Sequence, residues 1–321
     1  MQGFEDALRE EQARINAVIQ AEIAAMPELV RPVAAHTLNA GGKRLRPLLA
    51  VFMGKLFGVE HPDIYSLATA IEFFHVATLI HDDFLDNAST RRGNPAAHTI
   101  YAPVHAILGG DVMLAHAARM VARVGNARIA RQFAEGVVQT ATGEIDEFVH
   151  LGNIGLSHEE YLRVITGKTA WSLRCSCEIP AIYAERPEEE IEAAAVFGLE
   201  LGIAFQMVDD ALDIAPAERT GKPSGGDLRE RKCTPMAQLY WQSLPRPEAE
   251  AFARAFAAGS FTNADIDAII ADMRAKELDA RVRDMADEHL AKAEKALARL
   301  PEGESRELLA QVSAFVRSRG S

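Results

Sequence analysis

Two short aspartate clusters are the part of this sequence best suited to chemistry. HDDFLD at 81–86 and VDDALD at 208–213 share the pattern Asp-Asp-x-x-Asp. In a helix, the first and last aspartates of such a cluster lie on one face, where their repulsion costs a few tenths of a kcal/mol. A bound divalent cation would reverse the sign of that interaction. One cluster could be a solvated helix end, but two on otherwise apolar helices indicate a common use.

The ligand types in these clusters favour magnesium carried by a phosphorylated substrate. Carboxylate oxygens without paired His or Cys are the ligands that Mg²⁺ prefers. Gln206 stands one turn before the second cluster, and His75 stands two turns before the first. The six carboxylates are Asp82, Asp83, Asp86, Asp209, Asp210 and Asp213.

Basic residues stand where bound phosphates would need them. The net charge of −12 counts against a nucleic-acid surface, so any anion must be held by a local group of cations. GGKRLRP at 41–47 combines three cations with two glycines that allow close backbone approach. Other candidate residues are Arg91 and Arg92 behind the first cluster, Lys168-Thr169 after Gly167, and Lys222 and Lys232. Together they predict a site for two phosphorylated ligands.

Apolar residues recur at helical spacing along nearly the whole chain, and strand-like alternation is hard to find. This pattern predicts a single all-α domain, residues 1–321, built as a bundle of ten or more helices. Pro187 and the acidic residues after it predict a helix start. Residues 215–235 are rich in Gly, Pro and charge and predict a long loop of the kind that covers active sites.

The compartment follows from the cysteines and the N-terminus. Cys175, Cys177 and Cys233 are an odd set without paired spacing, which predicts reduced thiols rather than disulfides or a zinc site. The N-terminus has no basic segment followed by an apolar one, and no apolar run approaches about 18 residues. We therefore expect a soluble, cytoplasmic protein with no membrane span.

The motifs together resemble a known family. GGKRLRP, LIHDDFLD followed by RRGNPAAH, GGD at 109–111, GKTA at 167–170, FQMVDDALD and GKPSGGDLRERKCTP closely resemble, in order and spacing, the trans-isoprenyl diphosphate synthases, or polyprenyl synthetases. The resemblance implies a medium- or long-chain, bacterial-type prenyltransferase whose helices surround a central cavity, as in the isoprenoid synthase fold, and which is expected to be a homodimer. Such an enzyme joins an allylic diphosphate to isopentenyl diphosphate in Mg²⁺-dependent, head-to-tail (1′-4) elongation to a trans-polyprenyl diphosphate and releases pyrophosphate.

The resemblance also implies a role for each motif residue. Asp82, Asp86 and Asp209 would bind three Mg²⁺, with Asp83, Asp210 and Asp213 in support. Arg91, Lys168, Lys222 and Lys232 would hold the allylic diphosphate, and Lys43, Arg46, His75 and Arg92 the isopentenyl diphosphate. Thr169 and Gln206 would face the developing allylic cation. The chain departs from the family at Glu147, commonly Gln, at Arg231, commonly Gly, and between Thr234 and Pro235, where one residue is missing.

Product length in this family depends on bulk below the first aspartate motif. Ala77 and Thr78 are small, which predicts an open tunnel, and Phe133 could form its floor. Phe133 precedes Glu144 by eleven residues, about 16 Å at helical rise. We expect a product of geranylgeranyl length or longer. A short-chain farnesyl or geranylgeranyl synthase is the alternative, and Phe133 could equally be ordinary core.

Two other classes of protein use related patterns. Glu72 with His75, and Glu147 with His150, have the Glu-x-x-His spacing of di-iron helical-bundle oxidases. That class would leave GGKRLRP, the paired aspartate motifs and GKTA unexplained. A class I terpene cyclase would use the aspartates but not an isopentenyl diphosphate pocket.

Overall fold

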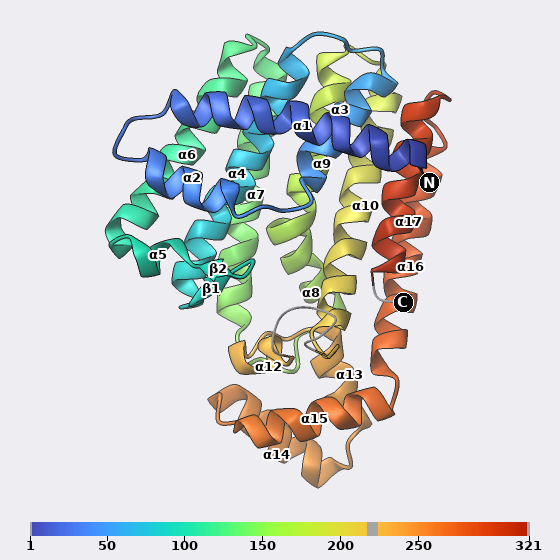
Figure 1. Cartoon of the computed structure of the whole chain (residues 1–321). Helices are drawn as coiled ribbons and strands as arrows, with labels where there is room; N and C mark the ends of the chain where they lie inside the picture. The colour runs from blue at the N-terminus through green and yellow to red at the C-terminus, as the bar shows by residue number, and fades with distance from the viewer. Residues whose placement is uncertain (1, 217–223, 320–321) are drawn as a thin grey trace. The chain divides into compact units, whose positions relative to one another are not determined.

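The computed structural model describes residues 2–216 and 224–319, with side chains from Asp6 onward, and nearly all of this part is helical (Figure 1). The finding confirms the all-α class with more than ten helices. The two short strands are β1 (Thr90–Arg91) and β2 (Asn94–Pro95). The helices are α1 (Gln2–Ala24), α2 (Arg31–Asn39), α3 (Leu45–Leu56), α4 (Asp63–Leu85), α5 (Ala97–Ile100), α6 (Pro103–Arg123), α7 (Ala127–His150), α8 (His158–Ile165), the π-helix η1 (Thr166–Ala170), α9 (Trp171–Tyr183), α10 (Glu188–Leu212), α12 (Gly226–Glu230), α13 (Pro235–Ser243), α14 (Arg246–Ala258), α15 (Asn263–Ala275), α16 (Leu278–Leu297) and α17 (Glu304–Ser318).

The helices form two compact units, each assembled from separate stretches of sequence. Unit 1 contains the residues up to Val137, Ser172–Gly198 and Leu297–Ala310. Unit 2 contains Val138–Trp171, Leu199–Ala296 and the residues from Gln311 on. The single domain around one central cavity stays a prediction.

In unit 1, α4 is the core helix, and α3 and α6 pack against it while α1 runs across it (Figure 1). Most of α4 is buried, as its nearly continuous apolar sequence requires. Two glycines of the GGD motif allow α6 to come close. A Cβ on Gly110 would lie 2.4 Å from His81 Nε2, and one on Gly109 would lie 2.9 Å from Val33. This packing fixes the C-terminal end of α4, where the first aspartate motif lies.

A small hairpin follows α4 and was not predicted. Asp86 caps the helix with its N–H donated to the Asp82 carbonyl at 2.8 Å, and β1 then pairs antiparallel with β2. The turn residues Arg92 and Gly93 have φ of 52° and 77°, as a two-residue type I′ turn requires. Strands of two residues are too short for any periodic signal in the sequence.

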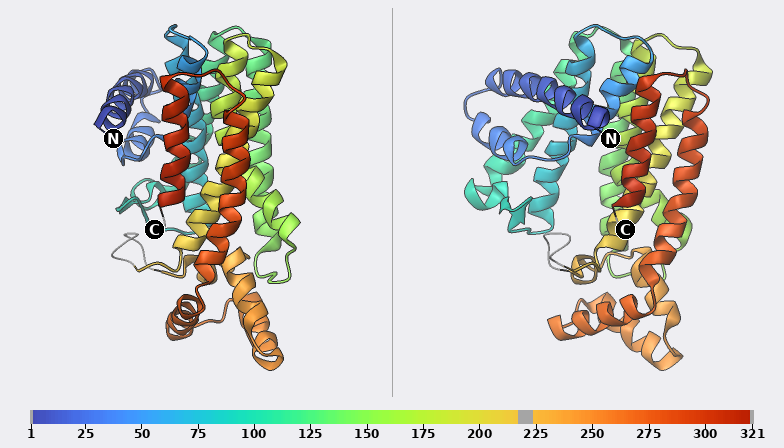
Figure 2. Two further views of the ribbon diagram at one scale, coloured as in Figure 1. Left: turned by 90° about the vertical axis from the view of Figure 1, so that its right-hand side faces the viewer. Right: turned by 45° about the vertical axis from the view of Figure 1, so that its right-hand side comes forward.

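In unit 2, the GKTA motif lies in the π-helix η1, a rare conformation that is frequent at functional sites. Ser157 and Glu160 form a capping box that starts α8 directly before it. Glycines on both neighbouring helices admit the wider turn: a Cβ on Gly143 would lie 2.2 Å from the Lys168 backbone nitrogen, and one on Gly202 would lie 2.5 Å from Ala170 Cα. Helices α13 to α15 lie at the end of this unit where α10 ends (Figure 2).

The predicted long loop contains a helix. Residues 217–223, including Lys222, lie outside the described residues, but α12 occupies 226–230. The Asp213 carboxylate accepts hydrogen bonds from the N–H groups of Gly226 (3.0 Å) and Asp227 (3.2 Å) at the start of this helix. Asp213 therefore anchors the C-terminal part of the segment, and burial raises the pKa of its carboxyl.

Three further expectations from the sequence concern the start of α10, the cysteines and membrane spans. The helix α10 begins at Glu188, as predicted, and all three cysteines are free and buried, which confirms the reduced thiols. Two helices, α4 and α10, are long and apolar enough to cross a membrane by composition. In each of them 67% of the apolar window is buried inside the protein, as in core helices of soluble proteins.

Candidate active site

The first aspartate motif in unit 1 has one buried and two half-buried carboxylates. Asp83 is buried, and its Oδ1 accepts a hydrogen bond of 2.6 Å from Arg91 Nε and a second contact from the same guanidinium. Asp82 and Asp86 are half-buried at the end of α4. Arg91 therefore sits against the motif through Asp83 and keeps 27% of its side chain exposed.

The GGKRLRP segment and the hairpin, which carry three of the residues predicted to bind isopentenyl diphosphate, contact each other in unit 1. Arg92 donates to the Gly41 carbonyl and lies directly over Gly42, where a Cβ would be 2.6 Å from its Nη1. Gly41 and Gly42 have φ of 84° and 137°, which glycine tolerates best. Arg46 is buried and donates to Ser172 Oγ at 2.7 Å, while Lys43 is exposed. The GGKR segment and the hairpin thus form one cationic region.

Arg44 and Glu72 are a buried pair that the sequence reading did not single out. Arg44 adopts a left-handed backbone (φ 50°) before α3 and donates to Glu72 Oε1 at 2.8 Å and to the Leu38 carbonyl. This pair fixes the start of α3 and hence Arg46. The cation in the middle of GGKRLRP is therefore structural. The Glu72 contact also argues against a di-iron role for Glu72 and His75, since its carboxylate is held by a cation.

His75 is neutral in the folded protein. Burial lowers the pKa of the imidazole well below its usual 6.5, and the positive charges of Arg46 and Arg92 lower it further. A neutral imidazole can donate one hydrogen bond and accept another, but it adds no charge. His75 therefore differs from the three cations with which it was grouped.

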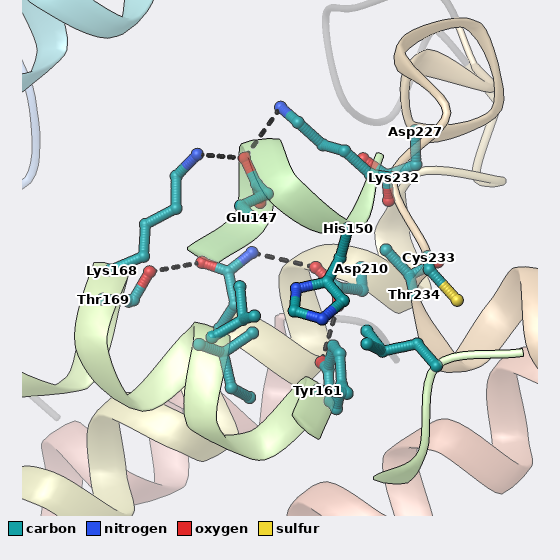
Figure 3. A pocket seen from close by; sticks show the side chains of 14 residues that line it. Glu147, His150, Tyr161, Lys168, Thr169, Asp210, Asp227, Lys232, Cys233 and Thr234 are labelled. Atoms are coloured by element: carbon teal, nitrogen blue, oxygen red, sulfur yellow. Dashed lines mark hydrogen bonds and ion pairs between the residues drawn. The ribbon is translucent and has the colours of Figure 1, made fainter. Parts of the chain in front are cut away.

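The clearest pocket of unit 2 has a volume of about 110 Å³ and contains Lys168, Thr169, Gln206, Asp210 and Lys232 from the predicted set (Figure 3). It lies among α7, α8, η1, α10 and the segment after α12. Tyr161 and Asp227 also line it, and neither was identified from the sequence. Glu147 and His150 line it as well, although the sequence suggested them only as a Glu-x-x-His pair and Glu147 also as a departure from the family.

A chain of hydrogen bonds crosses this pocket (Figure 3). Tyr161 donates to Asp210 Oδ2 at 2.6 Å, Gln206 donates to Asp210 Oδ1 at 2.8 Å, and Thr169 donates to Gln206 Oε1 at 2.8 Å. Burial raises the pKa of Asp210 to about 7, although both donors oppose the shift. Asp210 thus organises the two neutral dipoles, Gln206 and Thr169. Tyr161 lies seven residues before Lys168, a helical spacing that could have identified it.

The two pocket lysines are each held by carboxylates. Lys168 Nζ contacts Glu147 Oε2 and lies 2.9 Å from Glu144 Oε2. Lys232 Nζ lies 2.5 Å from Glu230 Oε2 and 3.8 Å from Glu147 Oε2. Burial and the charge of Glu147 raise the pKa of Glu144, against the effect of Lys168. Because lysines hold the Glu147 carboxylate, its proposed role as an iron ligand with His150 has no support.

Asp209 is the exposed member of the second motif, and a cation already faces it. Arg319 lies 3.0 Å from Asp209 Oδ1, and its guanidinium stacks 4.4 Å from the centre of the Phe205 ring. The Asp209 side chain is 44% exposed, and its carboxylate oxygens are the donors that Mg²⁺ prefers, so a bound ion would replace Arg319 as the positive partner. Asp82 and Asp86 supply the same donor type, so the residues present fit this ion.

Two departures from the family have structural reasons. Arg231 has a left-handed backbone with φ of 58°, a conformation that glycine adopts without strain. Its carbonyl accepts the Gly152 N–H at 2.8 Å, and its Nη1 donates to the Ala257 carbonyl at 3.3 Å, so arginine gains contacts there. Thr234 directly precedes Pro235, the first residue of α13, so no spare residue stands between them.

The predicted chain-length residues all lie in unit 1. Ala77 is buried on α4, and Thr78 is half-buried with its hydroxyl donated to the His75 carbonyl at 2.8 Å. Phe133 is buried and packs edge-on against Phe74, with ring centroids 5.8 Å apart. The aromatic partner on α4 was not anticipated.

Comparison with known proteins agrees with this geometry. The polyprenyl synthetase family model matches residues 27–273. Octaprenyl diphosphate synthase of Escherichia coli (strain K12) is 31% identical over 302 residues, covering 94% of this chain and 93% of that protein. Nonaprenyl diphosphate synthase of Mycobacterium tuberculosis is 33% identical over 321 residues, covering 98% and 94%. The crystal structure of a decaprenyl diphosphate synthase from Rhodobacter capsulatus is 33% identical, covers 100% of this chain and 99% of its own, and superposes with a TM-score of 0.92.

These similarities extend over almost the whole chain and confirm the resemblance drawn from the motifs. The named relatives make long polyprenyl products, which supports the medium- or long-chain type over the short-chain alternative. The protein belongs to the polyprenyl synthetase family and is a prenyltransferase.

Proposed function

We propose that the protein elongates an allylic diphosphate with isopentenyl diphosphate in Mg²⁺-dependent, head-to-tail (1′-4) steps and releases pyrophosphate at each step. The observation that carries the proposal is the unit 2 pocket, where two lysines stand beside a fixed chain of neutral dipoles. Lysines suit a leaving diphosphate, and dipoles without a nucleophile suit the carbocation it leaves behind. The same pocket has no evident use in an oxidase.

Within this function, the residues divide into groups by charge. Mg²⁺, when bound, neutralises the developing charge on the leaving diphosphate. The Thr169 hydroxyl donates a hydrogen bond to Gln206 Oε1, which orients both dipoles, and we assign the two residues to the allylic cation. The proposed groups are Asp82, Asp86 and Asp209 for three Mg²⁺, Arg91, Lys168, Lys222 and Lys232 for the allylic diphosphate, and Lys43, Arg46, His75 and Arg92 for isopentenyl diphosphate. Asp83, Asp210 and Asp213 support these groups from the positions described above.

The direct test supplies the protein with Mg²⁺, isopentenyl diphosphate and allylic primers of ten, fifteen and twenty carbons. We expect pyrophosphate release and prenyl products longer than each primer, separated by chromatography after dephosphorylation. Removal of Mg²⁺ with EDTA should stop the reaction. Absence of condensation with every primer would contradict the proposed reaction.

We propose a medium or long final product, limited by the Phe133 and Phe74 rings. Replacing Ala77 with Phe adds bulk one turn after Phe74 and should shorten the main product by two or more isoprene units, or about ten carbons. Ala77→Ser adds one atom and serves as the matched control. Thr78→Phe tests the same wall at a half-buried position if Ala77→Phe does not fold. An unchanged product distribution in both Phe variants would contradict the assignment.

We also propose a cytoplasmic homodimer. In unit 1, α6 exposes Val104 (62%) and Leu108 (53%), and in unit 2, α7 exposes Ile145 (65%) and Val149 (73%). Each pair is four residues apart and therefore lies on one helix face, and contiguous exposed apolar surface marks interaction sites. Analytical ultracentrifugation should give twice the chain mass of 35.0 kDa. A monomer at micromolar concentration would contradict the dimer.

A further inference from the structure

Glu147 lies between two lysines that the proposed function assigns to the allylic diphosphate (Figure 3). Its Oε2 contacts Lys168 Nζ and lies 3.8 Å from Lys232 Nζ. The side chains of Glu147, Lys168 and Lys232 are 18%, 20% and 17% exposed, so water screens their charges only in part. One carboxylate oxygen therefore faces both cations inside the pocket.

The carboxylates around these lysines outnumber them. Glu144 contacts Lys168, and Glu230 contacts Lys232, in addition to the contacts of Glu147. A diphosphate brings further negative charge to the same lysines and must bind against the field of these carboxylates. Glu147 opposes it most directly because it contacts both lysines, whereas Glu144 and Glu230 each contact one of them.

We propose that Glu147 is a positioning residue that weakens the hold of this pocket on diphosphates, and so sets the affinity for the allylic substrate and the release of pyrophosphate. The proposal rests on the proposed function. Glu147 acts on Lys168 and Lys232 before and after the reaction alike. Its removal should therefore change the binding constants of substrate and product more than kcat.

Glu147→Gln removes the charge and keeps the shape of the side chain. Titration calorimetry with inorganic pyrophosphate and Mg²⁺ should show binding about tenfold tighter than in the wild type, as expected for one charge removed at a few ångströms in a partly buried site. The KM for geranylgeranyl diphosphate should fall by a similar factor, with kcat changed by less than about threefold. Pyrophosphate binding by the variant should also weaken more steeply with added salt.

Asp146→Asn is the matched control on the same helix. Asp146 pairs with Arg163 at 2.7 Å, and neither residue lines the pocket, so pyrophosphate binding should stay within about twofold of wild type. Glu147→Asp keeps the charge and should bind pyrophosphate like the wild type. The Glu230 side chain is 41% exposed, so Glu230→Gln should fold like the wild type. It should tighten pyrophosphate binding by about twofold.

The outcomes distinguish a wrong role for Glu147 from a wrong proposed function. If the wild type binds pyrophosphate with Mg²⁺ but Glu147→Gln binds it no more tightly, the role of Glu147 is wrong and the proposed function stands. If Glu147→Gln does not fold, Glu147→Met, which also removes the charge, replaces it, and an affinity no tighter than that of the wild type overturns the role. If the wild type does not bind pyrophosphate with Mg²⁺ at all, the proposed function itself is wrong.

Discussion

The two aspartate motifs have the same spacing but different surroundings. The middle aspartate of each is buried, Asp83 in the first and Asp210 in the second. In unit 1, a cation, Arg91, holds Asp83. In unit 2, the neutral donors Tyr161 and Gln206 hold Asp210, and burial raises the pKa of its carboxyl to about 7. The first motif therefore orients a charge, and the second orients dipoles.

This difference shows how one sequence pattern can serve two purposes. In the proposed function, the arginine fixed beside the first motif would bind a phosphate, whereas Gln206 and Thr169 beside the second would face a carbocation. The third aspartates differ as well. Asp86 caps α4, and Asp213 holds the start of α12. What the two motifs share is a less buried leading aspartate, Asp82 in the first and Asp209 in the second.

The largest expected effect concerns these two leading aspartates. Asp82→Ala and Asp209→Ala should each lower kcat/KM by about a thousandfold, or ~4 kcal/mol, because each removes a proposed Mg²⁺ ligand. Condensation of labelled isopentenyl diphosphate at saturating Mg²⁺ measures the loss. Asp272→Asn, on the surface beside Lys276, is the control and should stay within about twofold. Near-normal activity of Asp209→Ala would mean that this carboxylate serves only its contact with Arg319.

Substitution of the two middle aspartates should lower the free energy of unfolding by different amounts. Asp83→Asn leaves the guanidinium of Arg91 without a buried counter-charge and should lower the free energy of unfolding by about 2–4 kcal/mol. Asp210→Asn should cost less than about 1 kcal/mol, since the Tyr161 hydroxyl can accept from the new amide while Gln206 still donates to its oxygen. Urea unfolding of the metal-free variants measures both. Equal losses would contradict the distinction between a charged and a neutral environment.

The smallest effect is expected at His75, the neutral group among the cations of unit 1. His75→Gln should keep the KM for isopentenyl diphosphate within about threefold, because an amide replaces the hydrogen bonds of a neutral imidazole. With a lowered pKa in the folded protein, His75 takes up a proton below about pH 6.5 only in the unfolded chain. Its contribution to stability is thus lost as the pH falls through 6.5, and His75→Gln should remove that part of the pH dependence.

The control for His75 is the pH profile of the KM. In the wild type we expect no change near pH 6.5 that the Gln variant lacks. A large rise of the KM in His75→Gln, or such a change near pH 6.5, would mean that a protonated imidazole binds the phosphate.

The sequence alone was sufficient to identify the helical class, the family and the residues that make up both aspartate motifs. Residue types can be read directly from a sequence, and helical periodicity can be read as well because it involves residues within one or two turns of each other. The hairpin at 90–95 was missed because its strands are too short for a periodic pattern, and α12 was missed because it has one turn. Arg44 was grouped with phosphate-binding cations because charge is visible in a sequence and burial is not.

Tertiary structure alone decided which partners each motif residue has. The contacts of Asp83 with Arg91, of Asp210 with Tyr161, and of Glu147 with two lysines each join residues 8 to 85 positions apart. No local rule specifies such pairs, because they depend on how close the helices pack. Glycines such as Gly143 and Gly110 set that closeness, and only the coordinates show which backbone or side chain each one admits.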